Sequence, residues 1–173
     1  EDVIAYAKSG LSGISREECD KFEAYAERWQ INKGRFTDGI VWNMNPDGFS
    51  AFHSEETDRE LLEIDAIRKK LLSPLIKLSS NISQSETVYD FTLALYNFIR
   101  SLSLSERLCE RVRELTALTE AELAEENSRL YRIICDSLDT LIECSGDEKT
   151  DAEAFVARLK ILFSSATVSK IPT

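Results

Sequence analysis

Apolar residues recur at intervals of three and four positions along most of the chain, the spacing that places them on one face of an α-helix. The clearest stripe consists of Val88, Phe91, Leu95, Phe98 and Leu102. No segment alternates apolar and polar residues over more than a few positions, as a half-buried strand would. The pattern predicts an all-α protein with six or seven helices around one core.

Capping signals locate the expected helix ends. In a capping box, a serine or threonine hydroxyl accepts the backbone N–H of the residue three positions later, whose side chain accepts the N–H of the first. Pairs with this spacing are Ser15 with Glu18, Thr119 with Glu122, and Thr150 with Glu153. Together with the stripes they predict helices over about 2–9, 15–29, 88–102, 105–115 and 119–144, one from about 55 that bends or breaks at Pro74, and a last helix from about 150.

A long segment without helical period follows the second expected helix. Residues 30–54 contain several glycines and a proline, together with the large apolar residues Phe36, Trp42, Met44, Phe49 and Phe52. A loop of about 25 residues is longer than compact domains usually contain. We therefore predict that these side chains make it a docking loop, pinned to the helical body or to a neighbouring domain. The chain is expected to form a single domain, with a helical hairpin over 1–29, the loop over 30–54 and a helical body over 55–173.

Charge narrows the classes of function. The net charge is −10, and residues 105–153 hold 14 acidic and 6 basic side chains. A free-standing nucleic-acid-binding protein usually presents a basic surface, so any contact with a polyanion is expected to avoid that stretch. No long apolar run and no signal-peptide pattern occurs, which predicts a cytoplasmic protein without membrane contact.

The residue types that bind metals are sparse and scattered. Cys19, Cys109, Cys135 and Cys144 form no C-x-x-C pair, and His53 is the single histidine. This pattern favours reduced thiols over a zinc or iron–sulfur site. His53 also lacks a neighbouring nucleophile by pattern, so a catalytic triad is not indicated.

Two short motifs imitate active sites. The stretch "KSGLSGIS", residues 8–15, has glycines close together, but Lys8 precedes them and a helix is expected before them, so a helix junction is favoured over a phosphate loop. Asp47, together with Asp147 and the acid and lysine that follow it, resembles a nuclease carboxylate set. No sheet is expected to unite these acids around a metal ion, and a small nuclease stays open only as an alternative.

Basic residues supply the candidate contacts with DNA or a partner. One cluster contains Arg68, Lys69 and Lys70, with Lys77 further along, and a weaker one contains Arg28, Lys33 and Arg35. The competing interpretation of the first cluster is a solvated helix face paired with Glu60, Glu63 and Asp65.

The order of residues resembles a family. "YAKSGLSGISREECDKFEAYAERWQINKGRF" is similar to a segment of the B subunit of AddAB-type ATP-dependent helicase–nucleases, with matches at Lys8, Ser9, Gly10, Leu11, Gly13, Ser15, Glu23, Tyr25, Ile31 and Gly34. Similarity continues through "IRKKLLSPLIKL", "SETVYDFTLALYNFI" and "LDTLIECSGDE", and includes Arg68, Pro74, Leu75, Leu138, Asp139, Gly146, Asp147 and Glu148.

The resemblance implies a role without chemistry in this chain. The parent protein would combine a helicase-like region that has lost its ATPase motifs with a nuclease domain, and would process double-strand DNA breaks for recombinational repair together with an A subunit. Mg²⁺, ATP and an iron–sulfur cluster would belong to the parent or its complex, and no cofactor to this chain. The chain would be an excised helical accessory insert, a scaffold for the DNA path or the subunit interface, with no catalytic residues. An unrelated helical protein-interaction module is the alternative.

Overall fold

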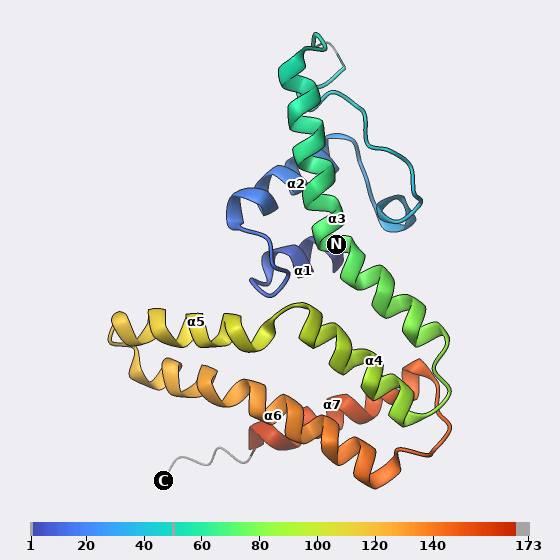
Figure 1. Ribbon diagram of the computed structural model, residues 1–173, viewed down its shortest axis with the longest axis vertical. Helices are drawn as coiled ribbons and strands as arrows, with labels where there is room; N and C mark the ends of the chain where they lie inside the picture. The colour runs from blue at the N-terminus through green and yellow to red at the C-terminus, as the bar shows by residue number, and fades with distance from the viewer. Residues whose placement is uncertain (1, 50, 169–173) are drawn as a thin grey trace. The chain divides into compact units, whose positions relative to one another are not determined.

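The computed structural model describes residues 2–49 and 51–168, without the side chains of residues 2, 33 and 166–168. Within these residues the fold consists of α-helices and one short 3-10 helix, which confirms the all-α prediction (Figure 1). The elements are α1 (Asp2–Lys8), α2 (Arg16–Arg28), η1 (Lys33–Phe36), α3 (Glu55–Ser83), α4 (Val88–Ser101), α5 (Leu104–Ala117), α6 (Ala121–Ser145) and α7 (Ala152–Val168). The described part contains no strand, only an isolated bridge between Thr87 and Lys149.

The chain divides into two compact units, Glu1–Ile76 (unit 1) and Lys77–Thr173 (unit 2). The boundary lies within α3, just after Pro74, and α3 continues through this proline instead of ending there. Proline lacks the N–H that would bond the carbonyl four residues earlier. Each unit has its own cluster of buried apolar residues, whereas the sequence predicts one core. The single domain stays a prediction.

The core of unit 1 forms between α2, α3 and the segment that joins them. Phe22 on α2 and Leu71 on α3 are completely buried. Ile64 and Ile67 on α3 belong to the same cluster. The apolar stripes predicted for these two helices therefore face a common core.

The core of unit 2 gathers three helices. Its buried residues are Val88 and Phe91 from α4, Leu138 and Leu141 from α6, and Phe155 from α7. The rings of Phe91 and Phe155 stack with centroids 5.2 Å apart. α5 and α6 pack beside one another, and α4 and α7 both contact α6 (Figure 1).

Of the three predicted capping boxes, one is present, although the helices expected from about 119 and 150 begin close by, at Ala121 and Ala152. The box at Ser15 is present, with the Glu18 N–H donating to Ser15 Oγ at 3.1 Å and the Ser15 N–H donating to the Glu18 carboxylate at 2.5 Å. The box at Thr119 is wrong, because Thr119 adopts a left-handed conformation with φ of 62° and α6 begins at Ala121. The box at Thr150 is also wrong, since the Asp151 carboxylate accepts the N–H of Ala154 instead.

The start of α4 has a double cap that the sequence patterns missed. Thr87 and Asp90 form a capping box. In addition, the turn after α6 lies against this end, so that the N–H groups of Val88 and Tyr89 donate to the carbonyls of Glu148 and Gly146, each at 3.0 Å. The four N–H groups at a helix start have no partner inside the helix. The turn after α6 supplies partners for two of these N–H groups and so connects the end of α6 to the start of α4.

Candidate functional site

The loop between α2 and α3 is folded onto unit 1 around Trp42. Its indole is 6% exposed and stacks on the rings of Phe22 and Tyr25, with centroids 5.6 and 5.5 Å away. Phe36 is also buried in this cluster, and Met44 packs partly buried against it. The prediction that the apolar residues pin the loop to the helical body therefore holds for these three side chains. Phe36 and Trp42 are buried in the chain's own core, and their role in docking stays a prediction.

The remaining two docking candidates are exposed. Phe49 and Phe52 are 95% and 97% accessible to solvent. Phe49 touches the buried Trp29 edge to face, with centroids 4.6 Å apart. The loop therefore has an inward half around Trp42 and an outward half that carries two aromatic rings.

Two side chains from the helices hold the loop backbone. The Tyr25 hydroxyl donates to the Met44 carbonyl at 3.0 Å and accepts the Met44 N–H at 3.1 Å. Burial raises the pKa of this phenol, so it keeps the proton that it donates. Arg68 donates to the Ile40 carbonyl at 2.9 Å. A loop of this length is thus fixed at points on both sides of Trp42.

Arg68 is a structural residue in this fold. Its guanidinium lies 4.9 Å from the centre of the Trp42 ring and donates to Asp65 from two nitrogens, at 2.7 and 3.1 Å. A guanidinium can stack on an aromatic ring and hold a carboxylate at the same time, because it is planar and carries several donors. These contacts leave Arg68 mostly buried. The predicted contact of Arg68 with DNA or a partner stays a prediction.

Arg68→Ala is expected to lower the free energy of unfolding of unit 1 by about 1–3 kcal/mol, since it removes a cation–π contact and charged hydrogen bonds. Lys69→Ala is the matched control, because Lys69 pairs with the same Asp65 at 2.7 Å from an exposed position. Exposed pairs contribute about 0–1 kcal/mol. Urea unfolding followed by tryptophan fluorescence measures both variants, and equal losses would contradict the structural role of Arg68.

The other basic candidates lie in different settings. Lys70 donates to the Glu18 carboxylate at 3.0 and 3.2 Å, which joins α3 to the start of α2. Arg28 donates to the carbonyl of Pro46. Arg35 and Lys77 are exposed, and the side chain of Lys33 lies outside the described residues. Lys77 belongs to unit 2 and the other basic candidates belong to unit 1.

The pairing of Glu18 predicts a dependence on pH. The Ser15 N–H, followed by Lys70, holds the pKa of Glu18 below its ordinary value. A carboxylate with a lowered folded-state pKa stabilises the fold above its unfolded-state pKa, and this stabilisation is lost as pH falls through the folded-state pKa. Unit 1 is therefore expected to lose stability in acid, below the usual pKa range of glutamate.

Glu18→Gln should remove that part of the acid sensitivity, while keeping an oxygen that can complete the capping box. Glu17→Gln is the control, since it removes the same charge at the neighbouring position. The Glu17 side chain is highly exposed and lies 3.4 Å from Lys21. Urea midpoints at about pH 7 and about pH 3, on either side of the usual glutamate pKa, measure the difference. An acid loss in Glu18→Gln as large as in the wild type would exclude this role of Glu18.

The glycine-containing stretch is a helix junction, as predicted. α1 ends at Lys8 and α2 begins at Arg16, and Gly10 has the positive φ of 74° that favours glycine after a helix. The Lys8 ammonium pairs with Glu23, and Glu18 occupies the start of α2. A hollow of about 490 Å³ lies beside the junction, and two of the groups that line it, the Lys8 ammonium and the Ser15 cap, are engaged in these contacts.

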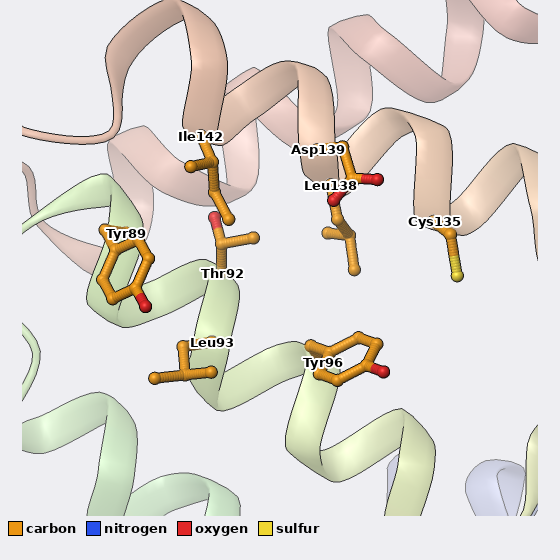
Figure 2. A pocket seen from close by; sticks show the side chains of 8 residues that line it. All are labelled: Tyr89, Thr92, Leu93, Tyr96, Cys135, Leu138, Asp139 and Ile142. Atoms are coloured by element: carbon orange, nitrogen blue, oxygen red, sulfur yellow. The ribbon is translucent and has the colours of Figure 1, made fainter.

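Helices α4 and α6 form a second hollow, which the sequence patterns did not indicate. It has a volume of about 300 Å³. The lining residues are Tyr89, Thr92, Leu93 and Tyr96 from α4, and Cys135, Leu138, Asp139 and Ile142 from α6 (Figure 2). We call this hollow the α4–α6 groove. The only sequence signal for it is a second apolar row on α4, Tyr89, Leu93 and Tyr96, beside the row that fills the core.

The residues considered for metal or acid–base chemistry are dispersed. Cys19 is buried in unit 1, whereas Cys109 and Cys144 are exposed in unit 2. His53 pairs with Asp58 at 2.6 Å on the surface. Asp47 lies in unit 1 and Asp147 in unit 2. Among the described residues, no group of three or more cysteine, histidine, aspartate or glutamate side chains could hold a metal ion, and no helix is long and apolar enough to cross a membrane.

Comparison with known proteins gives one consistent group of relatives. No family model matches the chain. The chain is 31% identical over 174 residues to the B subunit of the ATP-dependent helicase/deoxyribonuclease of Clostridium botulinum (strain Loch Maree / Type A3). Identity to the proteins of the same name is 30% over 173 residues in Acetivibrio thermocellus and 28% over 176 residues in Ruminiclostridium cellulolyticum. Each match includes 99% of this chain, which spans 15% of the relative's length.

Proposed function

Because the chain is homologous to one segment of the ATP-dependent helicase/deoxyribonuclease B subunits, we propose that it serves as that helical segment in such a protein and acts as a non-catalytic scaffold. The observation that carries this proposal is the match along 99% of the chain to 15% of each relative. A chain that carried the whole enzyme would span far more than 15% of its relatives' length. The same match speaks against a helical interaction module unrelated to this family.

The roles of the residues that carry the resemblance support a scaffold. Lys8 pairs with Glu23, Tyr25 fixes the loop backbone at Met44, and Ser15 caps α2. Each of these side chains is used in contacts within unit 1.

The subunit interface is the favoured site of action over the DNA path. Arg68 and Lys70, two of the basic residues first considered for DNA contact, are engaged by Asp65 and Glu18. Residues 105–153 are strongly acidic and would repel the phosphate backbone. Phe49 and Phe52, by contrast, offer exposed apolar rings of the kind that protein interfaces bury.

The cofactors implied for the parent protein are proposed to bind outside this chain. The scattered cysteines and acids described above do not fit a metal site or an iron–sulfur cluster. We propose that the Mg²⁺, ATP and cluster chemistry of DNA processing belongs to other parts of the parent protein and to its A-subunit partner.

Substitution of the two nuclease-like acids tests the proposal in the assembled complex. For a scaffold, Asp47→Asn and Asp147→Asn should change Mg²⁺-dependent DNA degradation and ATP-dependent unwinding by less than about twofold, since neither acid meets substrate. Trp42→Ala should reduce the amount of assembled complex, because it releases the loop that carries the exposed rings of Phe49 and Phe52, while activity per complex stays the same. Loss of cleavage in either aspartate variant, with assembly intact, would overturn the scaffold role in favour of a nuclease.

A further inference from the structure

Helix α4 carries two apolar faces, and unit 2 uses only one of them in its core. Val88 and Phe91 are buried against α6 and α7. Tyr89, Leu93 and Tyr96 form a second row at positions i, i+4 and i+7 and are 47%, 43% and 38% exposed. A helix that is apolar on both sides is usually covered on both sides. The second row therefore lies on a surface that the described chain covers only in part.

The opposite wall of the α4–α6 groove adds a charge. Figure 2 shows Tyr89 and Tyr96 at the two ends of the row on α4, with Leu93 between them, and α6 facing them with Ile142, Asp139 and Cys135. Asp139 is exposed, and no cation of the described residues lies within ion-pair distance of it. The groove thus has an apolar floor, aromatic ends and an unneutralised carboxylate at its edge.

The chemistry of these walls indicates what would bind. An aliphatic side chain matches the floor formed by Leu93, Leu138 and Ile142. An arginine or lysine matches Asp139, and its cation can also lie on a tyrosine ring such as Tyr96. Resting on the proposed function, we infer that the α4–α6 groove binds a segment of the partner A subunit in which an aliphatic residue is flanked by arginine or lysine.

Nucleic acid fits this groove poorly. Asp139 lies at its edge, and the surrounding stretch 105–153 has 14 acidic against 6 basic side chains. These charges attract a basic polypeptide and repel phosphate.

A segment of a separate polypeptide also fits the groove better than another segment of the parent polypeptide does. Packing within one chain mostly buries aliphatic side chains completely, whereas interfaces between proteins are enriched in tyrosine. Here Tyr89 and Tyr96 line the groove with more than a third of their surface exposed.

A site-specific cross-link identifies the occupant. The photoreactive amino acid p-benzoylphenylalanine is placed at Leu93 in the full-length parent protein, the complex with its A-subunit partner is purified with and without duplex DNA, and products of irradiation are mapped by mass spectrometry. The expected product joins Leu93 to a partner peptide that has an arginine or lysine within about four residues of the attached side chain, one helical turn. A product on DNA, on the same polypeptide or on a partner peptide without such a cation would overturn the inference, and so would the absence of any product.

A charge reversal separates this contact from general assembly. Asp139→Lys should lower the yield of the cross-link about tenfold, because it places like charges together in the groove. Asp136→Lys is the matched control, an exposed acid on the same helix that does not line the groove, and it should leave the yield unchanged. Equal yields in the two variants would refute the role of Asp139. An intact complex that lacks the cross-link would overturn the groove inference alone. A failure of the scaffold proposal would instead appear as lost DNA cleavage in the Asp47→Asn or Asp147→Asn variant.

Discussion

Replacing Trp42 with alanine is expected to lower the free energy of unfolding of unit 1 by about 3–5 kcal/mol, the range for removing a buried aromatic side chain. The indole is the meeting point of Phe22, Tyr25 and Arg68, all within 5.6 Å of its ring centre. Its removal leaves a cavity and also releases the loop that the ring anchors. Urea unfolding followed by fluorescence measures the effect, since Trp29, the other tryptophan, lies in the same unit.

Phe52→Ala is the matched control for this substitution. It deletes another aromatic ring from the same loop, but one that is 97% exposed. Substitutions on the surface usually change stability by less than about 0.5 kcal/mol. If Phe52→Ala destabilised the unit as much as Trp42→Ala, the division of the loop into an inward and an outward half would be wrong.

Phe155→Ala should have a similar effect on unit 2, a loss of about 3–5 kcal/mol. Phe155 is buried in the cluster formed with α4 and α6, and its ring stacks on Phe91 at 5.2 Å. Without the ring, α7 loses its buried residue in the shared core, while Leu159 and Leu162 pack there only partly buried. Circular dichroism measures the helical signal of the whole chain, while tryptophan fluorescence follows only unit 1, so the two probes together locate the change.

The neighbouring Val156→Ala provides the comparison for α7. Val156 is exposed on the same helix, and its truncation should have little effect on stability. Because each core cluster draws its residues from one unit, Phe155→Ala should shift the circular-dichroism transition and leave the fluorescence transition in place. A parallel shift of both transitions would contradict two separate cores.

The helical character of the chain could be predicted because its cause is local. The row Val88, Phe91 and Leu95 has helical spacing, and a stripe of that kind specifies a buried face whatever lies opposite. The start of α6 could not be predicted in the same way. Thr119 and Glu122 have the spacing of a capping box, yet Thr119 adopts a left-handed conformation in the turn after α5. The path of the chain between two packed helices outweighs a cap that contributes about 1 kcal/mol.

The candidate site depended on contacts that no pattern along the sequence contains. In the sequence, Arg68 stands in a basic cluster with Lys69 and Lys70, and its visible partners are acids that precede it on the same expected helix. In the fold, it also contacts Trp42 and the carbonyl of Ile40, which are distant along the chain. The α4–α6 groove was missed for the same reason, because its two walls come from helices separated by α5. Spacing along the sequence shows which residues share one face of a helix, but it does not show which other element that face packs against.

The cap on α4 affects the order in which the two units can fold during synthesis. Residues leave the ribosome one after another, starting at the N-terminal end. All residues of the core of unit 1 have been synthesised once the chain has reached position 76. The carbonyls of Gly146 and Glu148, which accept the N–H groups at the start of α4, are synthesised long after that helix begins. The first unit can therefore settle during translation, while the second must wait with its earliest helix unfinished until the turn after α6 has emerged.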